Sequence, residues 1–138
     1  MNIASTQRRA LMNALLALFS FVWGTAGAET TRADVPVVRV VIDFGDGVEK
    51  HFVRLAWHEK MTVWEATRAA DEHPRGIEVH HRGKGDTLFV SQIDDVKNEG
   101  GAGRNWIFRV NDEPGSRSAA ISPVAADDTI VWRFDKYR

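Results

Sequence analysis

The chain has 138 residues with 18 basic and 19 acidic side chains, a net charge of −1 with histidine neutral, and no cysteine. The near balance of charge argues against binding to nucleic acid or to an anionic lipid surface. Without cysteine there are no disulfide bonds, thiol nucleophiles or zinc–cysteine sites, so a hydrophobic core alone has to hold the fold.

The first 28 residues have the pattern of a signal peptide. Arg8 and Arg9 precede an apolar run over residues 11–23, and Ala26-Gly27-Ala28 is a small-residue cleavage signal. The alternative, a membrane anchor, needs an apolar run of about 20 residues, and this run is shorter. We therefore expect cleavage after Ala28, no stable membrane anchor afterwards, and an exported protein in the periplasm or outside the cell.

The mature chain would keep 110 of the 138 residues and, with Arg8 and Arg9 gone, 16 of the 18 basic side chains against 19 acidic ones. Residues 29–36 are polar and threonine-rich, which predicts a short disordered lead. Residues 37–138 have the length of one domain with one core.

This domain is predicted to begin with a β-hairpin. Residues 37–44 alternate so that one inner face of a strand holds Val38, Val40, Ile42 and Phe44. Gly45-Asp46-Gly47 supplies a turn, because glycine and aspartate tolerate positive φ. Residues 48–55 then return as a second strand, whose mixed pattern suits an edge or half-exposed position.

A helix is predicted after the hairpin. Thr62 and Glu65 have the spacing of a capping box. A helix from Val63 to about Glu72 has one narrow apolar stripe, which consists of Val63, Ala66, Thr67 and Ala70. Trp64 lies off this stripe, so it is either an exposed binding anchor or a cover for a sheet edge.

The rest of the chain predicts four more strands. Residues 77–82 and 87–93 flank a glycine-containing turn, and residues 94–99 lead into the glycine-rich run 100–103. The strand over 105–110 has Trp106, Phe108 and Val110 on one face, and the strand over 129–134 has Ile130, Trp132 and Phe134 on one face. One helix on one face of a mixed sheet is an α+β layout, and this order of elements describes a β-grasp, the ubiquitin-like fold.

Three stretches occur in order in the second half: SQIDDVKN at 91–98, GRNWIFRVN at 103–111 and ADDTIVWRF at 126–134. They resemble the transcobalamin C-terminal-like domain family, whose bacterial members are catalogued as a domain of unknown function. The resemblance covers residues 37–137 and implies a β-grasp fold, with the stretch after the glycines on the ligand side. In vertebrate cobalamin carriers this domain caps a ligand held largely by a separate helical domain, for which this chain has no room.

The chain departs from that family pattern at three turns. Asp95, Asp112 and Asp127 stand where the family has glycine. Aspartate tolerates left-handed backbone better than most residues, so we expect the turns to survive.

Residue patterns for catalysis or metal binding are weak. His80 and His81 are adjacent on a predicted strand and would point to opposite faces, so they cannot chelate one ion from a regular strand. The oxygen-rich segment 94–99 suits calcium by residue type, but its spacing fits no EF-hand loop, and a solvated turn is the alternative. No serine has the surroundings of a nucleophile elbow. We expect no catalytic residues, no metal site and no cofactor.

The glycine-rich loop is the predicted site. Its glycines uncover backbone amides, and Arg104 adds a planar donor suited to a carboxylate or phosphate. The proposed site residues are Asn98, Gly100, Gly101, Arg104 and Asn111. The alternative is a flexible connection with a solvated Arg104.

The function expected from these features is non-enzymatic binding of a small ligand or cofactor-like molecule through the region from Asn98 to Asn111. The alternative is a periplasmic or cell-surface protein–protein interaction in which an exposed strand edge pairs with a partner. A concave pocket beside the glycine loop would favour the first function, and a flat, bare strand edge would favour the second.

Overall fold

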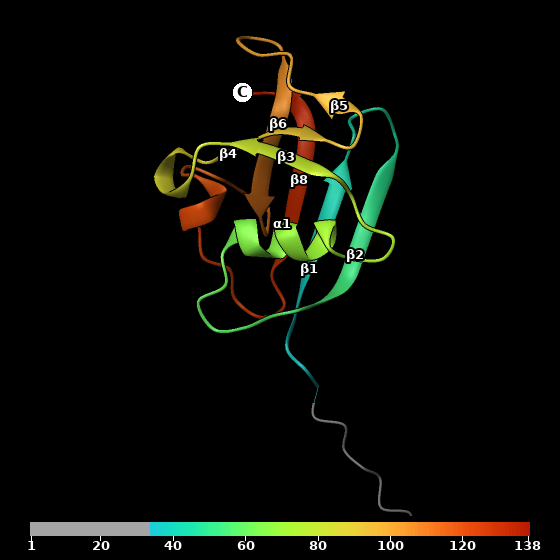
Figure 1. The fold of residues 1–138 in the computed structure, drawn as a ribbon, viewed down its shortest axis with the longest axis vertical. Coiled ribbons are helices and arrows are strands. Elements are labelled where there is room, and N and C mark those ends of the chain that lie inside the picture. The colour runs from blue at the N-terminus through green and yellow to red at the C-terminus, as the bar shows by residue number, and fades with distance from the viewer. Residues whose placement is uncertain (1–33) are drawn as a thin grey trace, which may run out of the picture. The chain divides into compact units, whose positions relative to one another are not determined.

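The computed structural model describes residues 34–138, so the predicted signal peptide and residues 29–33 of the predicted lead lie outside the described part. A five-stranded sheet forms the back of the domain (Figure 1). Its order is β2-β1-β8-β6-β7, with bounds Glu49–Ala56, Val37–Asp43, Thr129–Lys136, Arg104–Val110 and Glu113–Pro114. β1 runs parallel to β8 and the other neighbours are antiparallel, which makes the sheet mixed.

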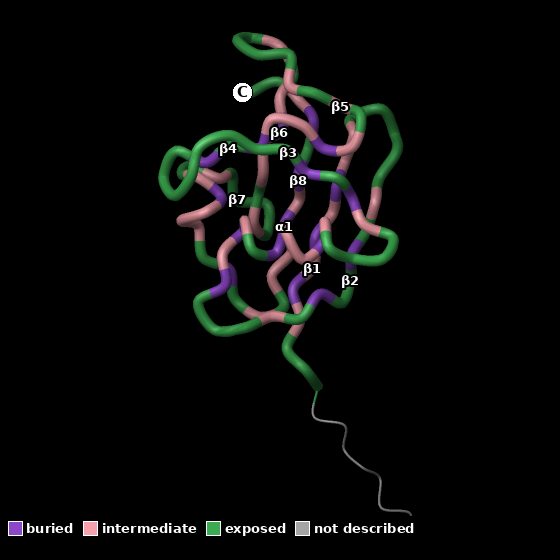
Figure 2. The backbone as a smooth tube through the Cα atoms, in the orientation of Figure 1, coloured by how far each residue is buried: buried purple, intermediate pink, exposed green. Residues whose placement is uncertain are grey.

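One face of this sheet forms the core. The predicted inner positions Val38, Val40 and Ile42 of β1 are fully buried. Buried positions alternate with partly buried ones along β1 and β8 (Figure 2), as the period of a strand requires. Cross-strand pairs join the aromatic residues, with Trp106 opposite Phe134 and Phe108 opposite Trp132.

The helix α1 (Val63–Asp71) is the one α-helix within residues 34–138. The capping box is confirmed: the Glu65 amide donates to Thr62 Oγ1 at 3.2 Å, and the Thr62 amide donates to Glu65 Oε2 at 2.8 Å. The predicted stripe of Val63, Ala66, Thr67 and Ala70 is buried. Thr67 lies in the core because Trp132 Nε1 donates to its Oγ1 at 2.8 Å.

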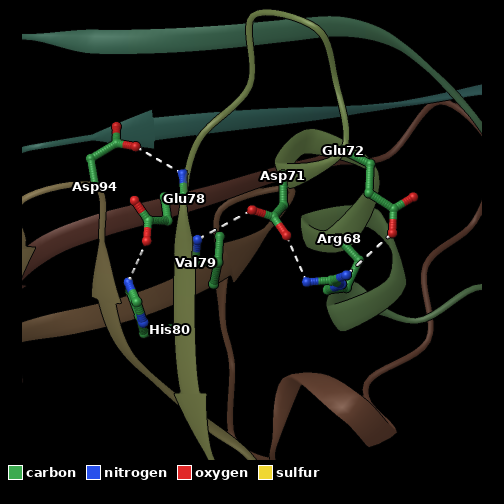
Figure 3. Close-up of polar contacts among 7 residues, drawn as sticks. All are labelled: Arg68, Asp71, Glu72, Glu78, Val79, His80 and Asp94. Carbon is green, nitrogen blue, oxygen red and sulfur yellow. Dashed lines mark hydrogen bonds and ion pairs between the residues drawn. The ribbon is translucent and has the colours of Figure 1, made fainter.

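A second, three-stranded sheet was not expected. β3 (Val79–Arg82), β4 (Phe89–Ile93) and β5 (Val96–Lys97) pair with one another in the order β3-β4-β5 and do not join the large sheet. Two carboxylates accept backbone hydrogen bonds at the start of β3 (Figure 3): the Val79 amide donates to Asp71 Oδ1 at 3.3 Å, and the Glu78 amide donates to Asp94 Oδ1 at 2.9 Å. The described architecture is therefore mixed α/β with two sheets and one helix, and the prediction of a single mixed sheet was wrong.

Aspartates hold several turns, as expected. Asp112 and Asp127 both have a φ of 68°. In the turn between β4 and β5 the positive φ falls on Asp94, at 50°, and not on Asp95. Two 3₁₀ turns complete the described chain, η1 at Gly85–Thr87 and η2 at Ala119–Ile121. Within residues 34–138 there is no helix both apolar and long enough to span a bilayer.

Trp64 packs as a cover. It is half-buried, and its ring centroid lies 4.6 Å from that of His81 on β3. The side chain thus bridges α1 and the small sheet.

The Trp132–Thr67 hydrogen bond gives a test of the core. We expect Thr67→Val to destabilise the domain by ~1–3 kcal/mol, since it leaves the buried Trp132 N–H without an acceptor. The free energy of unfolding in urea measures this cost. In a Trp132→Phe background there is no N–H to satisfy, so the same substitution should cost clearly less. An equal cost in both backgrounds would contradict the assigned role.

Candidate functional site

Asn98 is a brace between the two sheets. Its Oδ1 accepts the backbone N–H of Trp106 on β6 at 2.8 Å, and its Nδ2 donates to Val90 O on β4 at 2.9 Å. Trp106 also donates its indole N–H to Val96 O on β5 at 2.8 Å. The sequence predicted Asn98 as a ligand-site residue; in the structure its side-chain oxygen and nitrogen both make hydrogen bonds within the protein.

The glycine loop is held at its base. The Gly100 amide donates to Asn105 Oδ1 at 2.9 Å, and the Gly103 amide donates to Gly100 O at 2.9 Å. Gly100 and Gly101 have φ values of 79° and 49°, in the left-handed region that glycine adopts readily. Both glycines are exposed, so the loop projects from the end of β6.

Arg104 is engaged by Glu99 and is not a free donor. The Arg104 amide donates to Glu99 Oε2 at 2.7 Å, and its guanidinium Nη2 lies 3.0 Å from Glu99 Oε1. The same guanidinium lies 4.8 Å above the Phe134 ring. The pKa of Glu99 is lowered, first by the hydrogen bond from the Arg104 backbone amide and then by the Arg104 side chain.

Asn111 lies at the opposite end of β6. It comes seven positions after Arg104, and seven steps along a strand span roughly 20 Å. Its Oδ1 accepts the Thr129 amide at 2.9 Å, and its Nδ2 donates to Asp128 Oδ1 at 2.7 Å. The structure therefore brings Asn98, Gly100, Gly101 and Arg104 to one end of the domain and does not bring Asn111 to them.

A hollow of about 580 Å³ does lie beside the glycine loop. We call it the loop hollow; of the predicted site residues it includes Asn98 and Gly100, and Gly101 and Arg104 do not line it. The small sheet contributes Phe89 and several basic residues, namely His80, His81, Arg82 and Lys97. Apart from the Phe89 ring, its lining is polar, and most of the lining residues are exposed to solvent.

A second hollow, of about 540 Å³, runs along the edge of β6. We call it the aromatic groove. Its floor is aromatic, because the rings of Phe108 and Trp132 lie 5.2 Å apart beside Trp106. Phe89, 51 % exposed, and Tyr137, 79 % exposed, stand at its sides, and Arg117 and Asp86 lie on its rim.

Gly115 fits closely against the aromatic floor. A Cβ at this position would overlap the Phe108 ring, so the backbone packs directly on the ring face. The Gly115 amide also donates to Phe108 O at 2.9 Å. Ser118 Oγ lies 2.8 Å from both Gly85 O and Leu88 O and fastens the wall beyond η1.

The sequence analysis missed Phe89, Gly115 and Arg117. Phe89 left a weak signal, because it sits next to the buried Val90 and so belongs to the other face of its strand. Gly115 and Arg117 lie in a segment without periodicity, and only the tertiary structure places them at the groove. No group of three metal-ligating side chains occurs among residues 34–138.

Comparisons with known proteins bear on the family and the fold. The sequence pattern of a family described as Domain of unknown function (DUF4430) matches residues 61–136. None of the curated proteins matches the sequence. The crystal structure of a protein from Ruminococcus gnavus ATCC 29149, described as a "putative metal binding protein", has a similar fold with a TM-score of 0.58 and 16 % identity, over 75 % of this chain and 99 % of that one.

The Glu99–Arg104 contact predicts a partial rise in a pKa. In Arg104→Ala the pKa of Glu99 should rise because the guanidinium is gone, but it should stay below the ordinary value because the backbone amide still donates. NMR titration of the Glu99 side-chain carboxyl measures this. Arg75→Ala, on the loop after α1, is the control and should leave this pKa unchanged.

The sign of the pH effect follows. A carboxyl whose pKa is lower in the folded state contributes stability above its unfolded pKa and loses it as the pH falls through the folded value. A pKa of Glu99 that returned fully to its ordinary value in Arg104→Ala would show that the backbone hydrogen bond is not the larger cause.

Proposed function

Starting from the membership of this chain in the DUF4430 family, whose description assigns no activity, we propose that the protein is an exported, non-enzymatic domain that binds a small ligand in the aromatic groove. The observation that carries the proposal is the exposed ring of Phe89, 51 % exposed, opposite an aromatic floor. Exposed rings around a concave apolar surface are typical of small-molecule sites.

The groove has the composition of a binding site. Its volume of about 540 Å³ falls within the ~300–1,000 Å³ of small-ligand pockets. Trp106, 5 % exposed, and Trp132, 2 % exposed, fix the floor by their packing in the core. Arg117, Asp86 and Ser116 supply polar groups at the rim. A rigid apolar floor with a polar rim favours an organic ligand with an apolar part.

The groove favours binding over catalysis. No histidine lines it, and the hydroxyl of Ser118 is directed at backbone carbonyls. A serine nucleophile needs a base within hydrogen-bond reach. Asp86 is the one carboxylate side chain of the lining, and a metal ion needs several converging ligands, so an organic molecule suits the groove better than a metal.

We extend the proposal to the fold family. The hairpin β1–β2, the crossing helix α1 and the return of β8 parallel to β1 support a β-grasp arrangement, with the small sheet as an addition. The resemblance to the transcobalamin C-terminal-like family supports a binding role for the β6 region. The family pattern has tyrosines where this chain has Phe108 and Phe134, and the replacement at Phe108 makes the floor of the groove less polar.

The alternative function, pairing of a strand edge with a partner protein, is favoured by β2. This strand is an outer strand of the five-stranded sheet. A shallow hollow of about 430 Å³ runs beside it, and the titratable residues of the lining are all basic: Lys50, His51, Arg54, His73 and Arg75. Such an edge would suit an acidic extended segment, although charges and the bulge opposite Arg39 are also the usual protection of an edge strand.

Phe89 gives the test of the binding function. A native mass spectrum of the protein purified from its own source should show a retained small molecule, and Phe89→Ala should lower its occupancy about tenfold or more, as for an aromatic anchor. Val53→Ala, on β2, is the control, since Val53 is similarly exposed at 57 % but lies away from the groove. A retained protein partner in place of a small molecule would favour the β2 edge.

The export proposal has a separate test. The protein recovered from its own source should begin at Glu29, because the Ala26-Gly27-Ala28 signal directs cleavage there. N-terminal sequencing, or the intact mass, measures this. A chain that still carries Arg8 and Arg9 would count against export by a cleaved signal peptide.

A further inference from the structure

The edge of β6 is only partly covered by its neighbour. β7 pairs with Arg109 and Val110 and goes no further along the strand. Among the described residues, the edge from Arg104 to Phe108 therefore has no adjacent strand on that side, and the residues 106–108 line the aromatic groove. What happens to the backbone groups of this edge decides what the groove can recognise.

The direction of these groups follows from the pairing of β6 with β8. The Asn111 amide donates to Thr129 O at 2.9 Å, so the odd-numbered residues of β6 exchange hydrogen bonds with β8. Hydrogen-bonded and non-bonded pairs alternate in an antiparallel ladder. The amides and carbonyls of the even-numbered residues, Arg104, Trp106 and Phe108, therefore point away from β8, toward the open edge.

Four of these six outward groups are already occupied. The Arg104 amide donates to Glu99 Oε2 at 2.7 Å, and Arg104 O accepts the Glu99 amide at 2.9 Å. The Trp106 amide donates to Asn98 Oδ1 at 2.8 Å, and Phe108 O accepts the Gly115 amide at 2.9 Å. Trp106 O and the Phe108 amide remain; within residues 34–138 they face away from β8, lie beyond β7 and receive no backbone hydrogen bond from a turn or loop. They flank Ile107, as one acceptor and one donor side by side.

The surroundings make this vacant pair selective. It lies between the Phe108 ring and Trp106, with the exposed Phe89 in the same groove. A polar group that an apolar ligand covers without a hydrogen bond loses its contact with water, so a ligand in this groove is favoured when it supplies both partners. Trp106 O and the Phe108 N–H point to the same side of the strand, so the ligand N–H and C=O must also lie on one edge of the ligand. The matching arrangement is a cis amide, as in a lactam ring, because the N–H and C=O of a trans amide point in opposite directions.

The length of the vacant stretch limits the ligand. Asn98 closes it on one side and Gly115 on the other, so one donor and one acceptor are available and not a row of them. A long peptide strand would need several consecutive free donor–acceptor pairs along the edge. A short molecule with one amide and an apolar ring needs only this one.

We propose that the aromatic groove recognises a cis secondary amide, as in a lactam ring, joined to an aromatic or other flat apolar group: the ligand N–H donates to Trp106 O, its carbonyl accepts the Phe108 N–H, and its ring lies against Phe89 and Phe108. This inference rests on the proposed ligand-binding function of the groove and adds the chemical class of the ligand.

Three matched probes test the class. Isoindolin-1-one carries the ring, with the N–H and the carbonyl on one edge of a lactam. Phthalide replaces the N–H by an ester oxygen, and 2-methylisoindolin-1-one blocks it with a methyl group. Each is titrated against the whole protein, and the shift of the Phe108 amide proton is followed by NMR. We expect isoindolin-1-one to bind at least about fivefold more tightly than either analogue, as for loss of one neutral hydrogen bond.

The Phe108 amide proton should move downfield with isoindolin-1-one, while the amide of His51 on β2 serves as the internal control and should not move. Phe89→Ala should weaken the binding of all three probes together, because it removes the apolar contact and leaves the backbone hydrogen bonds. Equal affinities for the three probes, or no binding of isoindolin-1-one, would overturn the amide assignment. A small molecule retained by the purified protein and lost in Phe89→Ala would still support the groove as a binding site, so the two proposals fail separately.

Discussion

The hydrogen bonds of Trp106 join the two sheets of this domain. Its backbone amide is held by Asn98 and its indole N–H by Val96 O, each at 2.8 Å, while Asn98 also bonds to Val90 on β4. The ring packs edge-on against Phe44, with centroids 5.5 Å apart. Because these contacts reach β4, β5 and the large sheet together, they set the distance between the sheets. The aromatic groove is the space that this distance leaves at the edge of β6.

Two aspartate carboxylates make further connections between the small sheet and the rest of the domain. Asp71 takes the amide of Val79 and the guanidinium of Arg68, at 3.3 and 2.6 Å, so the end of α1 is tied to the start of β3. Asp94 takes the amide of Glu78 and the ammonium of Lys50 on β2, at 2.9 and 2.7 Å. Each aspartate accepts one backbone and one side-chain donor (Figure 3 shows both backbone contacts). A chain without disulfide bonds thus fixes its small sheet at two polar points as well as through its core.

The glycine loop and the groove differ in how their polar groups are used. At the loop the charged and amide side chains satisfy one another: Arg104 with Glu99, and Asn105 with Gly100. At the groove a backbone carbonyl and amide remain without partners among the described residues. Groups with spare hydrogen-bonding capacity in apolar surroundings are the ones a ligand can use. This contrast moves the proposed site from the loop to the strand that follows it.

Local sequence determined the elements. The alternation in β1 and β8, the capping box at Thr62 and the apolar stripe of α1 all depend on neighbours close in the chain, and the structure has each of them. Aspartates at 112 and 127 adopt positive φ for the same local reason. The sequence also predicted the strand containing Trp106 and Phe108, because these residues alternate on one face.

Only the tertiary structure decided which strands form which sheet and where a ligand could enter. β3 and β4 belong to a separate small sheet, whose start is held by hydrogen bonds from the Val79 and Glu78 amides to Asp71 and Asp94, and periodicity does not show these contacts. Asn111 was grouped with the loop because both flank one strand, but a strand separates its ends in space. The groove needs Phe89, Phe108, Gly115 and Arg117 from three segments, and no local pattern shows that these segments meet. Element type is a property of near neighbours, whereas a binding site is a property of contacts made across the chain.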